Sequence, residues 1–231
     1  MIWWNRQSSD DVRVRVEHYP NRIIPQRKME TVSVPGRSGD LLFMQDAFEN
    51  YEQPYDIYIS AEQIKLSSIA HKVAEWLLQS GYCRLEDSYE PDYFRMAYYS
   101  GNLDIENIMN HYGRATITFN CMPQRYLKSG EYEVACSNGQ ILVNPTAYDA
   151  KPLIRVAGNG NGVINVGNQH ISLNGIDGYI YIDSDRQDAY KDSTNCNNKM
   201  VGEFPTLQKS QAISWSGGIS GVIVVPRWFT I

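Results

Sequence analysis

The sequence predicts a mainly β protein built from two β-sandwich domains. Segments in which apolar and polar residues alternate recur along the whole chain, whereas only one segment shows helical spacing. That segment lies in the first half, and a single helix among strands followed by a helix-free half indicates two sheet systems. We expect domains at residues 1–128 and 129–231, with the seam between Pro123 and Gly130.

The strands are predicted from period-two alternation. In the first such segment Val12, Val14 and Val16 point one way, while the residues between them, including Arg13 and Arg15, point the other way. The same pattern appears in segments 55–59, 114–120, 153–156, 179–183 and 221–225. Turn-forming residues, often Gly or Asn, separate nearly all of these segments, as expected for strands joined by turns.

One helix is expected over about residues 61–80. Its apolar residues recur on one helical face, namely Leu66, Ile69, Ala70, Val73, Trp76 and Leu77. Ser60 and Gln63 fit a capping box at its start, and Gly81 fits the C′ position at its end. At this spacing Trp76 is interpreted as a core residue rather than a platform for a ligand.

The stretch VSVPGRSGDLLF, residues 32–43, predicts a turn between two strands, in a loop longer than the turn itself requires. Pro35 and Gly36 favour a type II turn from Val34 to Arg37, with Gly36 at positive φ. A loop longer than closure requires suggests contact with another molecule. Arg37 then either pairs with Asp40 inside the loop or bridges to a neighbouring subunit.

Charge and hydropathy exclude two classes of partner. The 231 residues carry a net charge of −5, which argues against the basic surface of a nucleic-acid-binding protein, so we expect no sequence-specific nucleic-acid partner. Polar residues follow the four apolar residues at the start, so we expect no signal peptide. The longest later aliphatic run, residues 222–225, is far too short for membrane insertion.

No metal or cofactor is expected. Cysteines and histidines are scattered singly, which predicts reduced thiols and structural imidazoles; they are Cys83, Cys121, Cys136, Cys196, His18, His71, His111 and His170. The tract 158–165 has glycines but lacks the third glycine and the following helix of a dinucleotide-binding motif. Its Asn-Gly pairs are interpreted as hairpin turns.

Two patterns allow other functions. Asp183 and Asp185 would lie roughly 6.5–7 Å apart on one strand face, near the spacing of an inverting glycosidase pair, although acids at strand ends are common. Aromatic residues that could bind a sugar or a protein partner are Tyr89, Tyr93, Tyr98, Tyr99, Trp215 and Trp228. We expect Trp215 and Trp228 to be core.

Across nearly its whole length the chain resembles the siphophage distal tail proteins. The residues that carry the resemblance are, in order, 7–12, 22–25, 30–32, 34–41, 119–123 with Tyr126, 144–145, 152–160, 182–185, 202–207 and 225–228. The chain departs from the family pattern where Ser38 replaces an acidic residue and Asp40 follows, and in its aromatic start, Met1 to Trp4. It also lacks the sugar-binding insertion that some members carry.

The resemblance implies a structural hub without catalysis, located in the virion at the tail tip and assembled in the host cytoplasm. It implies an N-terminal β-sandwich with one helix and an extended hairpin, six copies of which form a ring, and a galectin-like or jelly-roll C-terminal β-sandwich. Implied partners are further copies of the chain, the tail tube protein, a tail-associated lysin and receptor-binding or baseplate proteins. We expect residues 1–128 to form the ring and the hairpin to lie within residues 89–120.

Two alternatives from other classes remain open. One is a carbohydrate-binding adhesion protein that acts through the aromatics of the C-terminal domain. The other is a glycosidase centred on Asp183 and Asp185.

Overall fold

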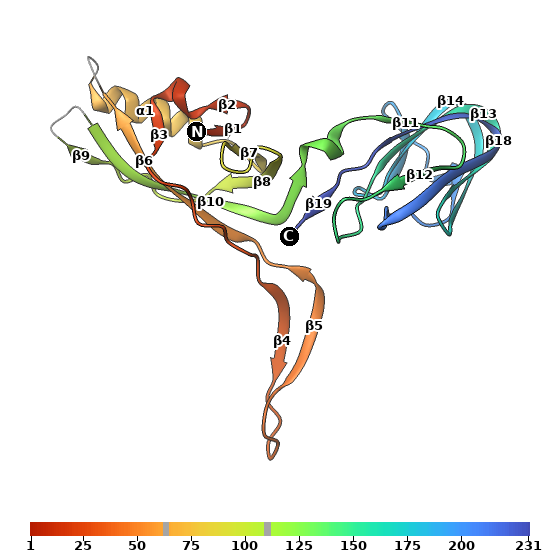
Figure 1. Ribbon diagram of the computed structural model, residues 1–231, viewed down its shortest axis with the longest axis horizontal. Helices are drawn as coiled ribbons and strands as arrows, with labels where there is room; N and C mark the ends of the chain where they lie inside the picture. The colour runs from red at the N-terminus through yellow and green to blue at the C-terminus, as the bar shows by residue number, and fades with distance from the viewer. Residues whose placement is uncertain (62–64, 109–111) are drawn as a thin grey trace. The chain divides into compact units, whose positions relative to one another are not determined.

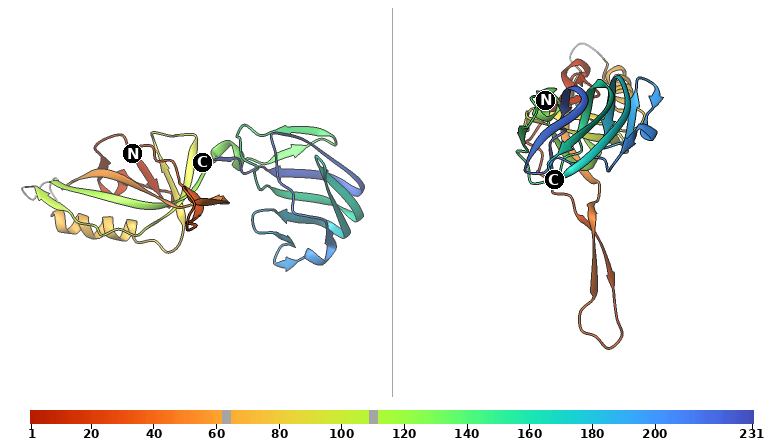
Figure 2. Two further views of the ribbon diagram at one scale, coloured as in Figure 1. Left: turned by 90° about the horizontal axis from the view of Figure 1, so that it is seen from below. Right: turned by 90° about the vertical axis from the view of Figure 1, so that its right-hand side faces the viewer.

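The chain divides into two compact units, seen in a computed structural model that describes residues 1–61, 65–108 and 112–231 (Figures 1 and 2). The first unit comprises residues 1–125 with residue 231, and the second comprises residues 126–230. The predicted fold class is confirmed, since the chain is mainly β and its described part contains one α-helix. The boundary between the two units lies between residues 125 and 126, within the segment from Pro123 to Gly130 where the seam was expected.

One curved sheet forms the body of the N-terminal unit. Its strands are β1 (Ile2–Trp4), β2 (Gln7–Ser8), β3 (Val14–Val16), β6 (Tyr51–Ser60), β7 (Cys83–Asp87), β8 (Tyr93–Tyr99), β9 (Glu106–Ile108) and β10 (Tyr112–Leu127). They follow the order β2-β1-β7-β8-β10-β6-β3, and β9 and β19 (Phe229–Thr230) also pair with β10. Strands β6 and β10 pair from Ser60↔Tyr112 to Tyr51↔Cys121, and β6 buries every second residue, as the alternation predicted.

The helix α1 (Leu66–Leu77) covers this sheet with the predicted face. Leu66, Ile69, Val73, Trp76 and Leu77 are buried, and Trp76, only 3% exposed, is a core residue. The predicted ends of the helix are wrong.

Strand pairing and a different C-cap account for these ends. Ser60 ends β6 and pairs with Tyr112, so the sheet ladder takes the residue expected to cap the helix. Lys65 is the N-cap and makes no side-chain cap bond; Gln63 lies outside the described residues. The helix ends at its C-cap Leu78, so Gly81, at φ +74°, belongs to the loop that follows.

Three long strands organise the C-terminal unit. These are β13 (Leu153–Val166), β14 (Gln169–Asp183) and β18 (Ser210–Val225). Shorter strands extend the sheet. Strands β11 (Val134–Cys136) and β12 (Gln140–Val143) pair with β18, β15 (Asp188–Lys191) and β17 (Met200–Val201) pair with β14, and β16 (Thr194–Asn195) pairs with β15. Because β12 and β11 pair with opposite ends of β18, and β17 and β15 with opposite ends of β14, the sheet has two halves joined by the middles of the long strands.

Glycines mark the middle of these long strands. The predicted hairpin turn in tract 158–165 is wrong, because the tract lies inside β13, where the register shifts between Gly160 and Gly162. The strands approach closely here: a Cβ atom at Gly158 would lie 2.2 Å from the backbone oxygen of Gly218. The glycines therefore serve bulges and close backbone contact, which bend the sheet.

Both halves of this sheet enclose one core. Ile164 and Ile213 from one half and Ile182 and Val224 from the other belong to the same buried cluster. The unit is therefore a β-sandwich. Trp228 lies in this core and Trp215 packs partly buried against it, as predicted.

The extended hairpin is β4 (Arg27–Val32) with β5 (Leu41–Phe48), a separate two-stranded sheet. The predicted location within residues 89–120 is wrong, because that segment supplies β8, β9 and β10 to the main sheet. Tyr93, Tyr98 and Tyr99 of that segment lie within β8, whose residues Phe94, Arg95 and Ala97 are buried, and not on a free ribbon. No helix in the described part of the chain is long and apolar enough to cross a membrane.

Candidate interaction surface on the hairpin

The loop at the hairpin tip has the predicted turn. The Arg37 N–H donates to the Val34 carbonyl at 3.1 Å, and Gly36 has φ +80°, so the type II turn is confirmed. Gly39 is also at positive φ, +82°. Within the described residues neither Arg37 nor Asp40 takes part in an ion pair, so the internal pair is not formed and the Arg37 guanidinium remains available.

The register of the two strands assigns each side chain to one of two faces. Met29 pairs with Met44 and Thr31 with Leu42 on the first face. Glu30 pairs with Phe43 and Val32 with Leu41 on the second face, because successive side chains alternate. Each face therefore carries apolar side chains from both strands.

These apolar side chains are exposed, since the hairpin projects from the body of its unit (Figure 1). The exposed fractions are 46% for Met29, 39% for Val32, 53% for Leu42, 55% for Phe43 and 57% for Met44. Four consecutive apolar residues, 41–44, are typical of a strand buried on both faces. An isolated two-stranded hairpin is also marginally stable in water. The hairpin therefore has the composition of a buried element, and among the described residues no other layer buries it.

The base of the hairpin is tied to the sheet. The Glu49 N–H donates to the Gln26 carbonyl at 2.8 Å and closes the ribbon. The Asn50 amide donates to the Tyr82 hydroxyl and to Asn120 Oδ1, both at 2.7 Å. Strand β6 begins directly after this residue, so the hairpin continues into the central strand pair of the unit.

A buried ionic network holds the start of β6. Arg95 donates through Nε to the Tyr51 hydroxyl at 3.0 Å, through Nη1 to Asp87 Oδ2 at 2.9 Å and through Nη2 to Glu90. Arg125 donates to Glu90 Oε1 at 2.8 Å. Burial alone would lower the pKa of Arg95, but the surrounding phenols and carboxylates raise it, so the guanidinium stays charged. Burial also raises the pKa of Tyr51 to about 12, which keeps its hydroxyl neutral.

The acids predicted as a possible catalytic pair have another role. Asp183 is buried and binds Arg227 through two hydrogen bonds, Oδ1–Nη1 at 2.7 Å and Oδ2–Nη2 at 3.1 Å. Burial raises the pKa of Asp183, but hydrogen bonds from Arg227 and from the backbone of Arg186 and Asp185 outweigh it and lower the pKa. Both carboxylate oxygens of Asp183 are therefore engaged by Arg227, and this ion pair is a structural anchor of the C-terminal unit.

Within each unit, aromatic rings contact one another. In the C-terminal unit Tyr181 stacks on Tyr190 at 5.4 Å and meets Tyr179 edge-on at 5.6 Å. Arg155 lies 4.8 Å from the Tyr179 ring centroid and Lys191 lies 5.4 Å from it. In the N-terminal unit Tyr82 meets Tyr98, and Tyr89 meets Tyr19. These rings therefore already have partners.

Metal-binding chemistry has no support in the described part of the chain, where no three His, Cys, Asp or Glu side chains gather. The four cysteines are free thiols, and burial raises the pKa of Cys121 to about 12. His111 lies outside the described residues.

Most of the N-terminal unit matches a known sequence family. Residues 14–121 match the sequence model of the phage tail protein RIFT-related domain. The N-terminal unit is thus similar to a phage tail domain. Among solved structures, the distal tail protein Dit (gp 19.1) of phage SPP1, described as a paradigm of the hub adsorption apparatus in phages that infect Gram-positive bacteria, has the same fold, with a TM-score of 0.79 at 12% identity. The match covers 100% of this chain and 98% of that one. No curated protein matches the chain.

The phage tail domain confirms the predicted resemblance to the distal tail proteins and places the protein in the tail of a virion. The hairpin lies inside the matched residues. Its location was missed from sequence, although the run of apolar residues 41–44 was a visible signal.

Proposed function

We propose that the protein is the hub of a long non-contractile phage tail. Six copies, the number that the family resemblance implies, close into a ring through the N-terminal units. The ring joins the tail tube to the tail-associated lysin and to receptor-binding or baseplate proteins, and DNA passes through its channel. The proposed role is structural, without catalysis.

The hairpin is the observation that carries the proposal. Its two faces expose apolar side chains that a single chain leaves uncovered, and contiguous exposed apolar surface marks an interaction site. A surface that meets a different surface on the next copy closes into a ring when the rotation allows it. The charges of residues 27–48, carried by Arg27, Lys28, Glu30, Arg37, Asp40 and Asp46, sum to zero, so they do not oppose packing against another copy.

The net charge of −5 is consistent with the proposed passage of DNA through the ring. DNA is bound mainly through its phosphates by Lys and Arg, so an acidic chain would not hold the passing duplex.

Ring formation is the property to test, with the full chain at high concentration, alone and with tail tube protein, imaged by negative stain. Leu42→Asp and Phe43→Asp each place a charge on one face of the hairpin. The matched control is Ile141→Asp, since Ile141 is a comparably exposed aliphatic residue (61%) in the other unit.

We expect six-fold rings for the native chain and for Ile141→Asp, and monomers for both hairpin variants. Rings that persist in both hairpin variants would show that the hairpin does not close the ring. If the native chain stays monomeric both alone and with tail tube protein, the proposed hub function is contradicted.

A further inference from the structure

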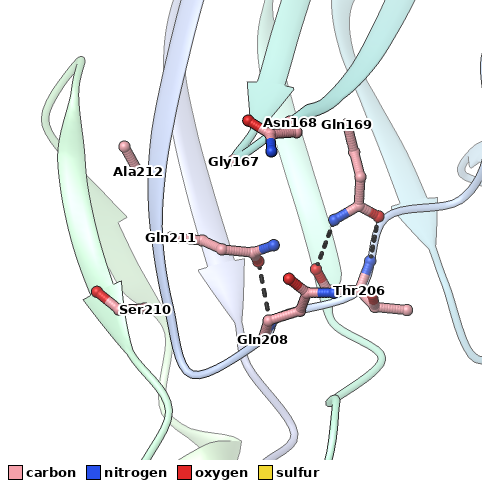
Figure 3. A pocket seen from close by; sticks show the side chains of 8 residues that line it. All are labelled: Gly167, Asn168, Gln169, Thr206, Gln208, Ser210, Gln211 and Ala212. Atoms are coloured by element: carbon pink, nitrogen blue, oxygen red, sulfur yellow. Dashed lines mark hydrogen bonds between the residues drawn. The ribbon is translucent and has the colours of Figure 1, made fainter.

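A polar pocket in the C-terminal unit is separate from the hairpin. It has a volume of about 500 Å³ and is lined by the β13–β14 turn, the loop before β18 and the start of β18 (Figure 3). The lining residues are Gly167, Asn168, Gln169, Thr206, Gln208, Ser210, Gln211 and Ala212. This volume falls in the range of about 300–1,000 Å³ typical of small-molecule sites.

Hydrogen bonds fix the rim of the pocket before any ligand arrives. The Gln169 side chain donates through Nε2 to the Thr206 carbonyl and accepts through Oε1 from the Thr206 N–H, both at 2.9 Å. The Gln208 N–H donates to Gln211 Oε1 at 3.0 Å. A ligand therefore does not have to order the loop, which removes one cost of binding.

Gln211 presents an unused donor inside this rim. Its side chain extends between those of Asn168 and Gln208 (Figure 3), and the residue is only 8% exposed. Its Oε1 is bonded, whereas the described residues provide no acceptor for its Nε2. A Cβ atom at position 167 would lie 3.0 Å from that nitrogen, so Gly167 leaves the space beside the amide open. This amide nitrogen is free to donate a hydrogen bond to an oxygen atom of a ligand.

The other open groups of the pocket have the same chemistry. The side chains of Asn168, Gln208 and Ser210 are exposed and make no hydrogen bond within the described chain. None of the lining residues is charged or aromatic. An ionic ligand would find no counter-charge to offset its lost hydration, and an apolar ligand would find little apolar surface. Amides and hydroxyls can both donate to and accept from the hydroxyl groups of a sugar.

We propose that this pocket binds a neutral saccharide unit. Binding rests on hydrogen bonds that compete with water, so a single unit binds weakly, with a Kd on the order of 1 mM. The site lies within one C-terminal unit and requires no ring, so its test is independent of the proposed hub function.

Saturation-transfer NMR on the full chain tests the proposal, because this method detects millimolar binding. The probes are neutral oligosaccharides of glucose, galactose, rhamnose and N-acetylglucosamine, with glucuronate-containing and phosphorylated oligosaccharides and an unstructured neutral peptide for comparison. Ser210→Trp fills the pocket, and Gln208→Ala removes one open amide without touching the backbone bond to Gln211.

The matched controls are Ser216→Trp, an exposed serine further along β18, and Asn198→Ala, an exposed amide elsewhere. We expect at least one neutral oligosaccharide to bind, a loss of at least tenfold in affinity for Ser210→Trp, a smaller loss for Gln208→Ala, and no change for the controls. Three results would overturn the proposal. The first is that no neutral oligosaccharide binds at a concentration 20-fold above the expected Kd of about 1 mM. The others are that only the anionic sugars or the peptide bind, or that Ser210→Trp leaves the binding of the neutral oligosaccharide intact.

Discussion

Gly158 is required because the backbone of β18 occupies the place of a side chain. A Cβ atom there would lie 2.2 Å from the Gly218 oxygen, a contact that only movement of the strands can relieve. We expect Gly158→Ala to destabilise the C-terminal unit by about 1–3 kcal/mol, the usual cost of overpacking. Gly221→Ala is the control, since no atom lies within 4 Å of its added Cβ and its φ is not positive. Urea unfolding measures both, and equal stability of the two variants would contradict the close approach.

Asp87 is a buried carboxylate that holds the base of the hairpin. It accepts from the Tyr55 hydroxyl at 2.8 Å, from Arg95 and from two backbone N–H groups. Asp87→Asn keeps the shape but leaves Arg95 without one of its two carboxylates. We expect a loss of about 3 kcal/mol in unfolding free energy, as for other broken buried pairs.

Asp46→Asn is the control for this variant, because Asp46 is fully exposed and lies 3.9 Å from Arg27. Exposed pairs contribute little, so no measurable change is expected. A loss for Asp87→Asn no larger than that of the control would show that the network does not stabilise the unit.

Asp183 makes the stability of the C-terminal unit depend on pH in the acidic range. Its pKa is lowered in the folded protein, so its stabilisation is present above the unfolded pKa of about 4 and is lost as pH falls through the lower folded pKa. We therefore expect Asp183→Asn to reduce the melting temperature at pH 7 and the gap from the native chain to narrow by pH 3. A constant gap across this range would contradict the ion pair with Arg227.

Residue roles set by local chemistry were predictable, and those set by distant partners were not. Positive φ at Gly36 follows from its position after proline in a turn, and the burial of Trp76 follows from helical spacing. The partner of Asp183 is Arg227, which lies far along the chain and reaches it only through the fold. Sequence spacing therefore suggested a pair with Asp185, although Asp183 is held by Arg227 instead.

The hairpin is an element whose order depends on contacts outside its own chain. No other layer of the described chain covers β4 and β5, so their backbone hydrogen bonds open easily in the monomer. We expect amides of residues 27–48 to exchange within seconds to minutes in the free chain and to become protected on ring assembly. Amides of β6 and β10 serve as the internal control, since both strands pair on both sides in the sheet. Unchanged exchange of the hairpin in assembled rings would show that it stays uncovered.

Elements were predictable where one periodicity dominated. Alternation located β6, β10, β13, β14 and β18, and helical spacing located α1. The start of the helix was missed because Ser60 suits both a cap and a strand, and the long pairing with β10 decides between them. Tract 158–165 was missed because Asn-Gly pairs suit both hairpin turns and bulges, and only the neighbouring strand β18 distinguishes the two.

The whole molecule has two separate hydrophobic cores, one in each compact unit. We therefore expect two calorimetric transitions, each with its own core. Ile57→Ala empties part of the first core and Ile182→Ala part of the second, and each should cost about 2–5 kcal/mol because both side chains are almost fully buried.

Each variant should lower the temperature of one transition and leave the temperature of the other unchanged. Hydrogen exchange of residues 51–60, in the first unit, and 179–183, in the second, assigns each transition to its unit. Ring assembly should tolerate Ile182→Ala at temperatures where the first unit stays folded, because the proposed ring contacts belong to the N-terminal unit. If both variants lower both transitions equally, the units unfold as one cooperative body, and the domain division and the confinement of the ring to residues 1–128 are both wrong.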